Sequence, residues 1–315
     1  MSRPRAAFFG SPEFAVPTLD ALAELADVVA VVAQPDKPAG RGLTLRPPAV
    51  KVRALELGLP VWQPRKLRDG VVAKQLQDLV PDVAVVIAYG RILPEDVLAA
   101  PRLGCVNLHG SLLPRWRGAA PIQWAVASGD PTTGVTLMQM DAGLDTGPML
   151  STLETPIGSE ETAGDVFARL STLSADLLRR DLPRFLGGEL SATPQDNERA
   201  THARPLDKSD GELDFRRSAL ALAHHVRGMS PWPGAYALDK GVSVKVHRAS
   251  ALTLSAEGAA PGTVLGGDRD GIRVACGEGV LAIQELQQPG RKRLSAEAFL
   301  AGRGWPTGTV LGGGA

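Results

Sequence analysis

This sequence has little cysteine and no net charge. Two of its 315 residues are cysteine, Cys105 and Cys276, and their wide separation argues against a disulfide framework and a cysteine-based metal site. The apolar neighbours of Cys105 predict a thiol buried in the core. Lysine plus arginine and aspartate plus glutamate number 34 each, so the formal charge is zero. This balance argues against a chain that binds nucleic acid over its whole surface.

Long apolar segments are missing as well. No run approaches the ~20 residues of a membrane helix, and the apolar stretch near the N-terminus is too short for a signal peptide. We therefore expect a cytoplasmic protein that does not act at a membrane. The hydrophobic fraction is 44% and glycine has no fixed period, which argues against wholesale disorder and against a collagen-like fibre. A length of 315 residues favours two domains.

Short apolar runs alternate with helical patterns in the first half of the chain. Ala6–Gly10, Val28–Ala33 and Val83–Ala88 are apolar on both faces, which is typical of central strands in a parallel sheet. The helical patterns between them imply strand–helix–strand units. We predict a Rossmann-like α/β domain over residues 1–188, with a mostly parallel sheet and with ligands beyond the carboxyl ends of the strands.

The second half has a different character. A long helical pattern over residues 163–186 is followed by a polar segment with little periodicity, which predicts a linker over residues 189–206. From residue 207 to residue 315, short β-rich runs recur between glycines and aspartates. This spacing predicts a small barrel or sandwich as the second domain.

Polar side chains lie at the ends of two further predicted strands, Cys105–Leu108 and Val135–Met140. Asn107 and His109 stand two apart, so their side chains share one face of a strand. The amide can polarise a carbonyl and the imidazole can move a proton. A histidine whose hydrogen bonds are all satisfied inside the core would show the same sequence pattern. Asp141 and Asp145 flank a glycine-containing turn after the second strand. Either could orient His109 or hold a water molecule, or could simply cap its own turn.

Positive charge gathers in one stretch despite the neutral total. Between residues 35 and 68 there are eight basic residues and two acidic ones, and a loop at 34–51 that is rich in glycine and proline holds much of the excess. Such a cluster can face an anion or can be an ordinary solvated surface. The fingerprint G-x-G-x-x-G is absent, which argues against a dinucleotide site. The basic residues are Lys37, Arg41, Arg46, Lys51, Arg53, Arg65, Lys66 and Arg68.

Four long motifs run through the first half: QPDKPAGRG from residue 34, VIAYGRILP from residue 86, NLHGSLLPRWRGAAPIQWA from residue 107 and GVTLMQMDAGLDTGPML from residue 134. With further matches near both ends, the chain resembles the methionyl-tRNA formyltransferases, a family of folate-dependent formyltransferases. The resemblance implies transfer of the formyl group of 10-formyltetrahydrofolate to the free amino group of initiator methionyl-tRNA. The product would be N-formylmethionyl-tRNA, used in translation initiation.

The resemblance also implies roles for individual residues. Asn107, His109 and Asp145 match the family's catalytic residues. Asn107 would donate to an oxyanion, and His109, or a water molecule fixed by Asp145, would relay a proton. The implied folate contacts are a loop of Ser111, Leu112, Leu113 and Pro114 and a pocket wall that includes Val86, Ile87, Tyr89 and Leu93. The expected tRNA contacts are Arg41, which matches an arginine of the family's acceptor-end loop, and its basic neighbours Lys37 and Arg46.

The second domain is similar to the family's OB-like β-barrel, which contributes to tRNA binding, and Arg291–Arg293 is a further candidate contact. The implied partners are aminoacylated initiator tRNA and the folate co-substrate. Neither a metal nor a membrane is implied, and we expect a monomer. One departure concerns Leu43 and Thr44, which stand where many relatives carry lysines.

Three other functions remain alternatives. A formyltransferase acting on a small amine, such as a nucleotide-linked amino sugar, would share the catalytic residues, but the PAGRG loop and the β-rich second domain favour tRNA. A non-catalytic RNA-binding protein would have lost Asn107, His109 or Asp145, and all three are present. A nicotinamide-dependent reductase would need the missing glycine fingerprint.

Overall fold

A seven-stranded sheet organises the first of two units in the computed structural model, which describes residues 3–39, 44–302 and 304–312. Its strand order is β10-β9-β7-β6-β1-β2-β5. The five strands from β7 to β5 in this order run parallel. Strand β9 pairs antiparallel with β7, and β10 pairs antiparallel with β9. The strands are β1 (Arg5–Phe9), β2 (Asp27–Val32), β5 (Val61–Trp62), β6 (Val83–Val86), β7 (Cys105–His109), β9 (Thr132–Gln139) and β10 (Met149–Pro156). The predicted Rossmann-like sheet is therefore confirmed.

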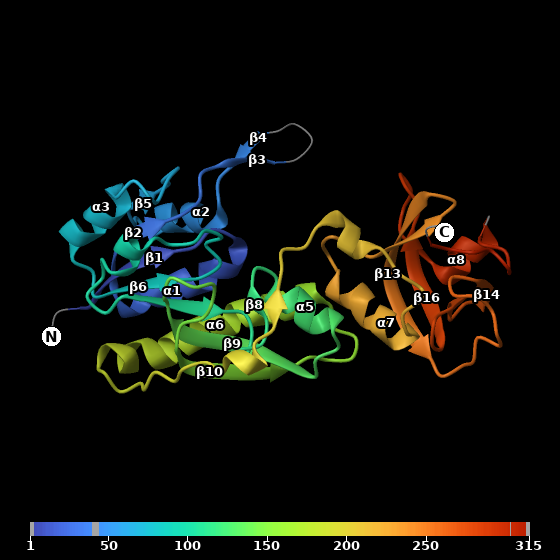
Figure 1. Cartoon of the computed structure of the whole chain (residues 1–315). Coiled ribbons are helices and arrows are strands. Elements are labelled where there is room, and N and C mark those ends of the chain that lie inside the picture. The colour runs from blue at the N-terminus through green and yellow to red at the C-terminus, as the bar shows by residue number, and fades with distance from the viewer. Residues whose placement is uncertain (1–2, 40–43, 303, 313–315) are drawn as a thin grey trace. The chain divides into compact units, whose positions relative to one another are not determined.

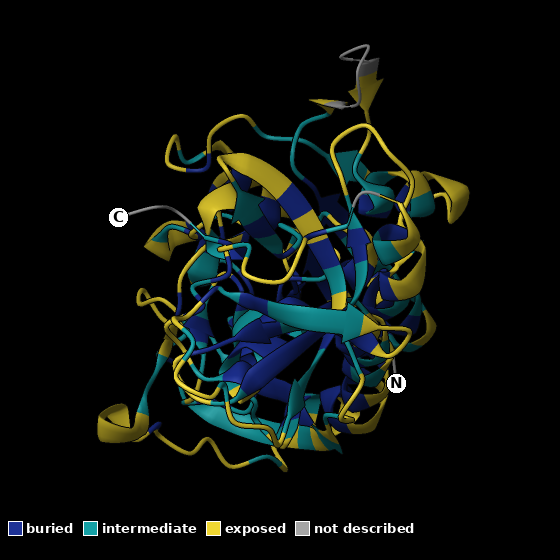
Figure 2. Ribbon diagram, turned by 90° about the vertical axis from the view of Figure 1, so that its right-hand side faces the viewer, coloured by how far each residue is buried: buried dark blue, intermediate teal, exposed yellow. Residues whose placement is uncertain are grey.

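The central strands are buried because both of their faces are apolar. Ala6, Ala7, Phe8 and Phe9 of β1 have no exposed surface, and Figure 2 shows the central strands in the colour of buried residues. The helices associated with this unit are η1 (Glu13–Ala15), α1 (Val16–Leu25), α2 (Ala49–Glu56), α3 (Val71–Leu79), α4 (Glu95–Leu98) and α6 (Ala163–Leu186). The predicted long helix at 163–186 is present with these bounds.

Cys105 lies in the apolar core of the first unit, as expected. It is 3% exposed, and burial raises the pKa of its thiol to about 12, so the thiol stays protonated. Cys276 is also a free, buried cysteine. Neither side chain is therefore placed for thiolate chemistry.

Two short pairings extend the first unit beyond its main sheet. β3 (Lys37–Ala39) and β4 (Thr44–Arg46) form an antiparallel hairpin that reaches away from the sheet of this unit (Figure 1). β8 (Arg117–Gly118) pairs in parallel with β11 (His202–Ala203). The segment predicted as a linker thus contributes β11 and the short helix η2 (Asn197–Arg199). The domain boundaries at residues 188 and 207 remain a prediction.

The second unit comprises residues 122–131, 157–166 and 205–315. Its sheet is antiparallel in the order β12-β13-β16-β15-β14, and β17 pairs with β16. The predicted β-rich second domain is confirmed as a mostly antiparallel sheet. The strands are β12 (Tyr236–Asp239), β13 (Val242–Leu252), β14 (Val264–Asp268), β15 (Gly271–Ala275), β16 (Val280–Gln287) and β17 (Leu294–Ser295). Its helices are α5 (Pro121–Ala127), η3 (Lys208–Gly211), α7 (Ala219–Gly228) and α8 (Ala296–Ala301).

Candidate active site

The three predicted catalytic side chains meet at the carboxyl end of β7. Asn107 and His109 project from the same face of this strand and are 9% and 6% exposed. Asp145, in the loop after β9, reaches both of them. Its Oδ1 lies 3.5 Å from Asn107 Nδ2, and its Oδ2 lies 3.7 Å from His109 Nδ1. An amide, an imidazole and a carboxylate therefore converge in one largely buried place.

The structure separates the roles of the two aspartates in this loop. Asp141 Oδ1 accepts hydrogen bonds from Gly143 N at 3.0 Å and from Thr146 Oγ1 at 2.7 Å, so Asp141 caps its own turn. Asp145 Oδ2 instead accepts from Gly118 N at 2.9 Å. The residue pattern left both aspartates open and the family resemblance implied Asp145, which is the one that lies beside Asn107 and His109.

One hydrogen bond defines the tautomer of His109. Its Nε2 lies 2.8 Å from the carbonyl oxygen of Trp116, which can only accept, so Nε2 carries the proton. In the neutral ring Nδ1 then has a free lone pair, and this atom faces Asp145. A proton taken up at Nδ1 would place a positive imidazolium beside a carboxylate, a favourable arrangement in a buried site.

Hydrogen bonds within the predicted folate loop and to Thr136 of β9 hold this loop in place. Ser111 Oγ donates to Arg115 O at 2.6 Å, Leu113 N donates to Thr136 Oγ1 at 3.1 Å, and Thr136 Oγ1 donates to Ser111 O at 2.7 Å. The Leu113–Pro114 peptide bond is cis. Ser111 and Leu113 are buried, whereas Leu112 and Pro114 are partly exposed. The hydroxyl of Ser111 is thus engaged within the loop, and Leu112 and Pro114 offer the accessible surface.

The predicted pocket wall is apolar and buried. Val86, Ile87, Tyr89 and Leu93 are each at most 5% exposed, and the Tyr89 ring packs edge-on against Phe9 at 5.4 Å between centroids. Burial raises the pKa of the Tyr89 hydroxyl. Within the part of the chain that the structure describes, this hydroxyl makes no hydrogen bond. The hydroxyl is therefore a buried polar atom enclosed in the apolar core of this unit.

The hairpin places two of the predicted tRNA contacts together. Lys37 stands opposite Arg46 in the β3–β4 register, and both side chains are exposed. At the root of the hairpin, the Asp36 carboxylate accepts from Gln63 Nε2 at 2.7 Å and from Lys51 Nζ at 2.9 Å. These hydrogen bonds hold the pKa of Asp36 below its usual range. Arg41 lies outside the described residues.

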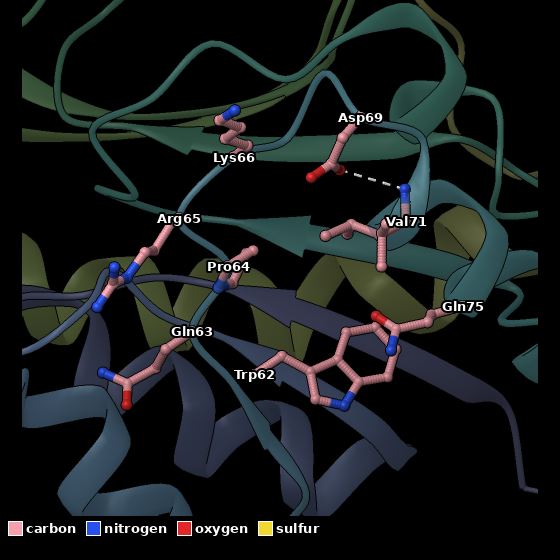
Figure 3. Close-up of a pocket in the computed structure, with 9 residues that line it drawn as sticks. Trp62, Gln63, Pro64, Arg65, Lys66, Asp69, Val71 and Gln75 are labelled. Atoms are coloured by element: carbon pink, nitrogen blue, oxygen red, sulfur yellow. Dashed lines mark hydrogen bonds between the residues drawn. The ribbon is translucent and has the colours of Figure 1, made fainter.

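A pocket of ≈ 410 Å³ opens elsewhere in the first unit, between the end of β5 and the start of α3 (Figure 3). It is lined by Trp62, Gln63, Pro64, Arg65, Lys66, Asp69, Val71, Val72 and Gln75. None of the predicted catalytic or folate-contacting residues lines it. It is therefore separate from the catalytic group.

The described residues contain neither a membrane-spanning helix nor a cluster of metal-binding side chains. No helix among them is long and apolar enough to cross a membrane. In the same residues, no group of three or more histidine, cysteine, aspartate or glutamate side chains is arranged to hold a metal ion.

Known proteins that are similar to this chain show the family to which it belongs. Residues 5–182 match the family described as Formyl transferase, and residues 205–304 match its C-terminal domain. A methionyl-tRNA formyltransferase of Sorangium cellulosum (strain So ce56) is 52% identical over 98% of this chain and 99% of its own length. One of Myxococcus xanthus (strain DK1622) is 53% identical over 96% of each chain. This chain belongs to the methionyl-tRNA formyltransferase family.

Solved structures agree with this family at the level of the fold. An N-formyltransferase of Helicobacter canadensis, in complex with folinic acid and dTDP-3-aminofucose, superposes with a TM-score of 0.67 over 91% of this chain and 99% of its own. Its sequence identity is 15%, so the likeness concerns the fold alone. Both units of this methionyl-tRNA formyltransferase family member therefore have a known architecture.

Sequence reasoning missed the residues that hold the catalytic group in place. The carbonyl of Trp116 binds His109, Gly118 N binds Asp145, and Thr201 Oγ1 accepts from Trp116 N at 2.9 Å. Each of these contacts uses a backbone atom of Trp116 or Gly118, and the type of a residue does not predict what its backbone binds. Thr201 lies in the polar segment predicted as a linker, where it carries no periodic signal.

Proposed function

We propose that this chain transfers the formyl group of 10-formyltetrahydrofolate to the α-amino group of initiator methionyl-tRNA, giving N-formylmethionyl-tRNA. The observation that carries the proposal is the meeting of Asn107, His109 and Asp145 in a chain about half identical to methionyl-tRNA formyltransferases. The transfer takes place in the cytoplasm, and the chain acts as a monomer. Residues 1–188 form the catalytic domain, and residues 207–315 contribute to tRNA binding.

The proposed chemistry uses Asn107 Nδ2 and His109 Nδ1. Attack of the amine on the formyl carbon gives a tetrahedral intermediate whose oxygen is negative. Asn107 Nδ2 donates to that oxygen, and its 3.5 Å approach to Asp145 is long enough to leave the amide available. His109 Nδ1 accepts the proton lost by the amine and returns it to the departing folate nitrogen. Asp145 stabilises the imidazolium between these two steps.

The folate and tRNA surfaces are assigned on the same basis. The partly exposed Leu112 and Pro114 and the buried wall of Val86, Ile87, Tyr89 and Leu93 would hold the folate. Lys37 and Arg46, with Arg41 between them in sequence, would contact the phosphates of the acceptor end. In the second unit Arg291 and Lys292 are exposed, whereas Arg293 pairs with Glu285.

A comparison of acceptors tests this function. Purified protein with 10-formyltetrahydrofolate is expected to formylate methionyl-tRNA and to leave a nucleotide-linked amino sugar unchanged. Mass spectrometry of the acceptor after the reaction identifies the product. Formylation of the sugar alone would contradict the proposal and assign the chain to small amines.

The hairpin is expected to govern tRNA affinity through charge. The double variant Lys37→Ala/Arg46→Ala should raise the KM for methionyl-tRNA about 10-fold at physiological salt, since each lost phosphate contact costs roughly 3-fold. The KM for the folate should stay unchanged. Steady-state kinetics between about 50 and 200 mM salt should also show a shallower salt dependence.

Arg53→Ala supplies the matched control from the same basic stretch. Its guanidinium is already engaged, because Nε donates to Asp20 at 2.7 Å and NH1 donates to Glu56 at 3.0 Å. This variant should bind tRNA like the wild type. If the double variant kept the wild-type KM and salt dependence, Lys37 and Arg46 would not contact the tRNA.

A further inference from the structure

The backbone of Asp145 adopts a conformation that residues with a β-carbon rarely take. Its φ is 54°, in the left-handed region. The preceding Leu144 is 58% exposed, so burial of that side chain does not hold the loop. Such a conformation persists only where surrounding contacts enforce it. Aspartate takes this conformation more readily than most residues, and contacts around the turn stabilise it further.

Gln195 supplies those contacts. Its Nε2 donates to the carbonyl oxygen of Asp145 at 2.8 Å and to that of Gly147 at 2.7 Å, so the two protons of one amide bridge the turn. Gln195 is 9% exposed and lies 50 residues beyond Asp145 in the sequence. The bridge holds the main chain on both sides of Thr146 and thereby fixes where the Asp145 carboxylate points.

Arg117 fixes the orientation of the Gln195 amide. Its Nε donates to Gln195 Oε1 at 2.9 Å, so the oxygen of the amide faces the guanidinium and the nitrogen faces Asp145. Arg117 is 5% exposed, and its NH2 also donates to Asn197 Oδ1 at 2.8 Å. The next residue, Gly118, donates its N–H to the Asp145 carboxylate. Asp145 is therefore held at its carboxylate by β8 and at its carbonyl by Gln195.

We propose that Gln195 is a positioning residue for formyl transfer and that the segment containing it is a structural part of the active site. The proposal rests on the proposed function. Without the bridge, the Asp145 backbone relaxes out of the left-handed region, and its carboxylate moves away from His109 Nδ1 and Asn107 Nδ2. Binding of the two substrates should be unaffected, because Gln195 bonds to Asp145, Gly147 and Arg117 and to none of the residues proposed to contact the folate or the tRNA.

The variant Gln195→Glu tests the bridge with little change of shape. A glutamate can still accept from Arg117, but it cannot donate to the carbonyls of Asp145 and Gly147. We expect kcat to fall about 10- to 100-fold, while the KM values for the folate and for tRNA stay within about 3-fold. Gln195→Met removes the same donors without adding charge, and it serves if the glutamate variant does not fold.

Three comparisons separate positioning from a merely structural role. Glu198→Gln changes an exposed residue of the same segment and should keep the wild-type kcat. In an Asp145→Asn background, Gln195→Glu should cause no further loss, since both substitutions act through one carboxylate. A wild-type kcat per folded Gln195→Glu molecule would overturn the proposal, and so would an equal further loss in the Asp145→Asn background.

Hydrogen exchange tests the bridge without any activity. The Gly118 amide is protected by its bond to Asp145 Oδ2. In Gln195→Glu, NMR should show this amide exchanging at least about 10-fold faster, whereas Glu198→Gln should leave it unchanged. Unchanged exchange would overturn the proposal even if the wild type formylated nothing. A wild type without transfer activity, together with faster exchange of the Gly118 amide in Gln195→Glu, would instead count against the proposed function alone.

Discussion

Asp145→Asn is expected to lower kcat for formyl transfer by about 10²- to 10⁴-fold while the protein stays folded. Asparagine keeps the shape of the side chain, and its Oδ1 can still accept from Gly118 N. What is lost is the negative charge 3.7 Å from His109 Nδ1. This charge would stabilise the imidazolium that forms when His109 takes up the proton of the amine.

The neighbouring Asp141 offers a matched control. It lies in the same loop, and its carboxylate accepts hydrogen bonds from Gly143 N and Thr146 Oγ1. Asp141→Asn can still cap the turn and should stay within about 3-fold of the wild-type kcat. Steady-state kinetics of both variants, with thermal unfolding to confirm folding, make the measurement. If Asp145→Asn and Asp141→Asn changed kcat equally, the charge of Asp145 would have no specific part in formyl transfer.

His109→Gln is expected to cause the second large loss, again about 10²- to 10⁴-fold in kcat. The glutamine amide can still donate to Trp116 O, as His109 Nε2 does, but it has no basic nitrogen in place of Nδ1. Proton transfer from the amine then lacks its acceptor. The KM values should change little, because the substitution removes an interaction made chiefly in the transition state.

His202 is the control for this second prediction. Its side chain is exposed on β11, and its strand pairs with β8 through backbone atoms. His202→Gln should therefore retain the wild-type rate. Rapid single-turnover measurements with bound folate and methionyl-tRNA separate transfer from binding. A His109→Gln enzyme that transfers at the wild-type rate would show that the proton leaves by another route.

The elements that could be predicted from sequence are those that bury apolar side chains at a regular period. The central strands β1, β2, β6 and β7 have apolar runs, and α6 repeats its apolar positions over 24 residues. Strand β10, with the sequence MLSTLETP, was not predicted. It lies at an edge of the sheet and is only partly buried, so its sequence carries no apolar run.

The cluster of Asn107, His109 and Asp145 could be predicted in part for a different reason. The spacing of Asn107 and His109 places them on one strand face whatever the fold around them. The choice between Asp141 and Asp145 depends on how a turn is folded, and both aspartates suit the same turn chemistry. Gln195 lies far away in the sequence, and its role depends on three contacts that form only in the folded chain. No local pattern could have identified it.

Formation of formyl-methionyl-tRNA by the wild type, His109→Gln and Asp145→Asn, measured side by side at saturating 10-formyltetrahydrofolate, tests the central claim most directly. The account predicts rapid formation by the wild type and a loss of at least about 100-fold in each variant, with all three proteins folded. Absence of product with the wild type, or undiminished product with both variants, would contradict it.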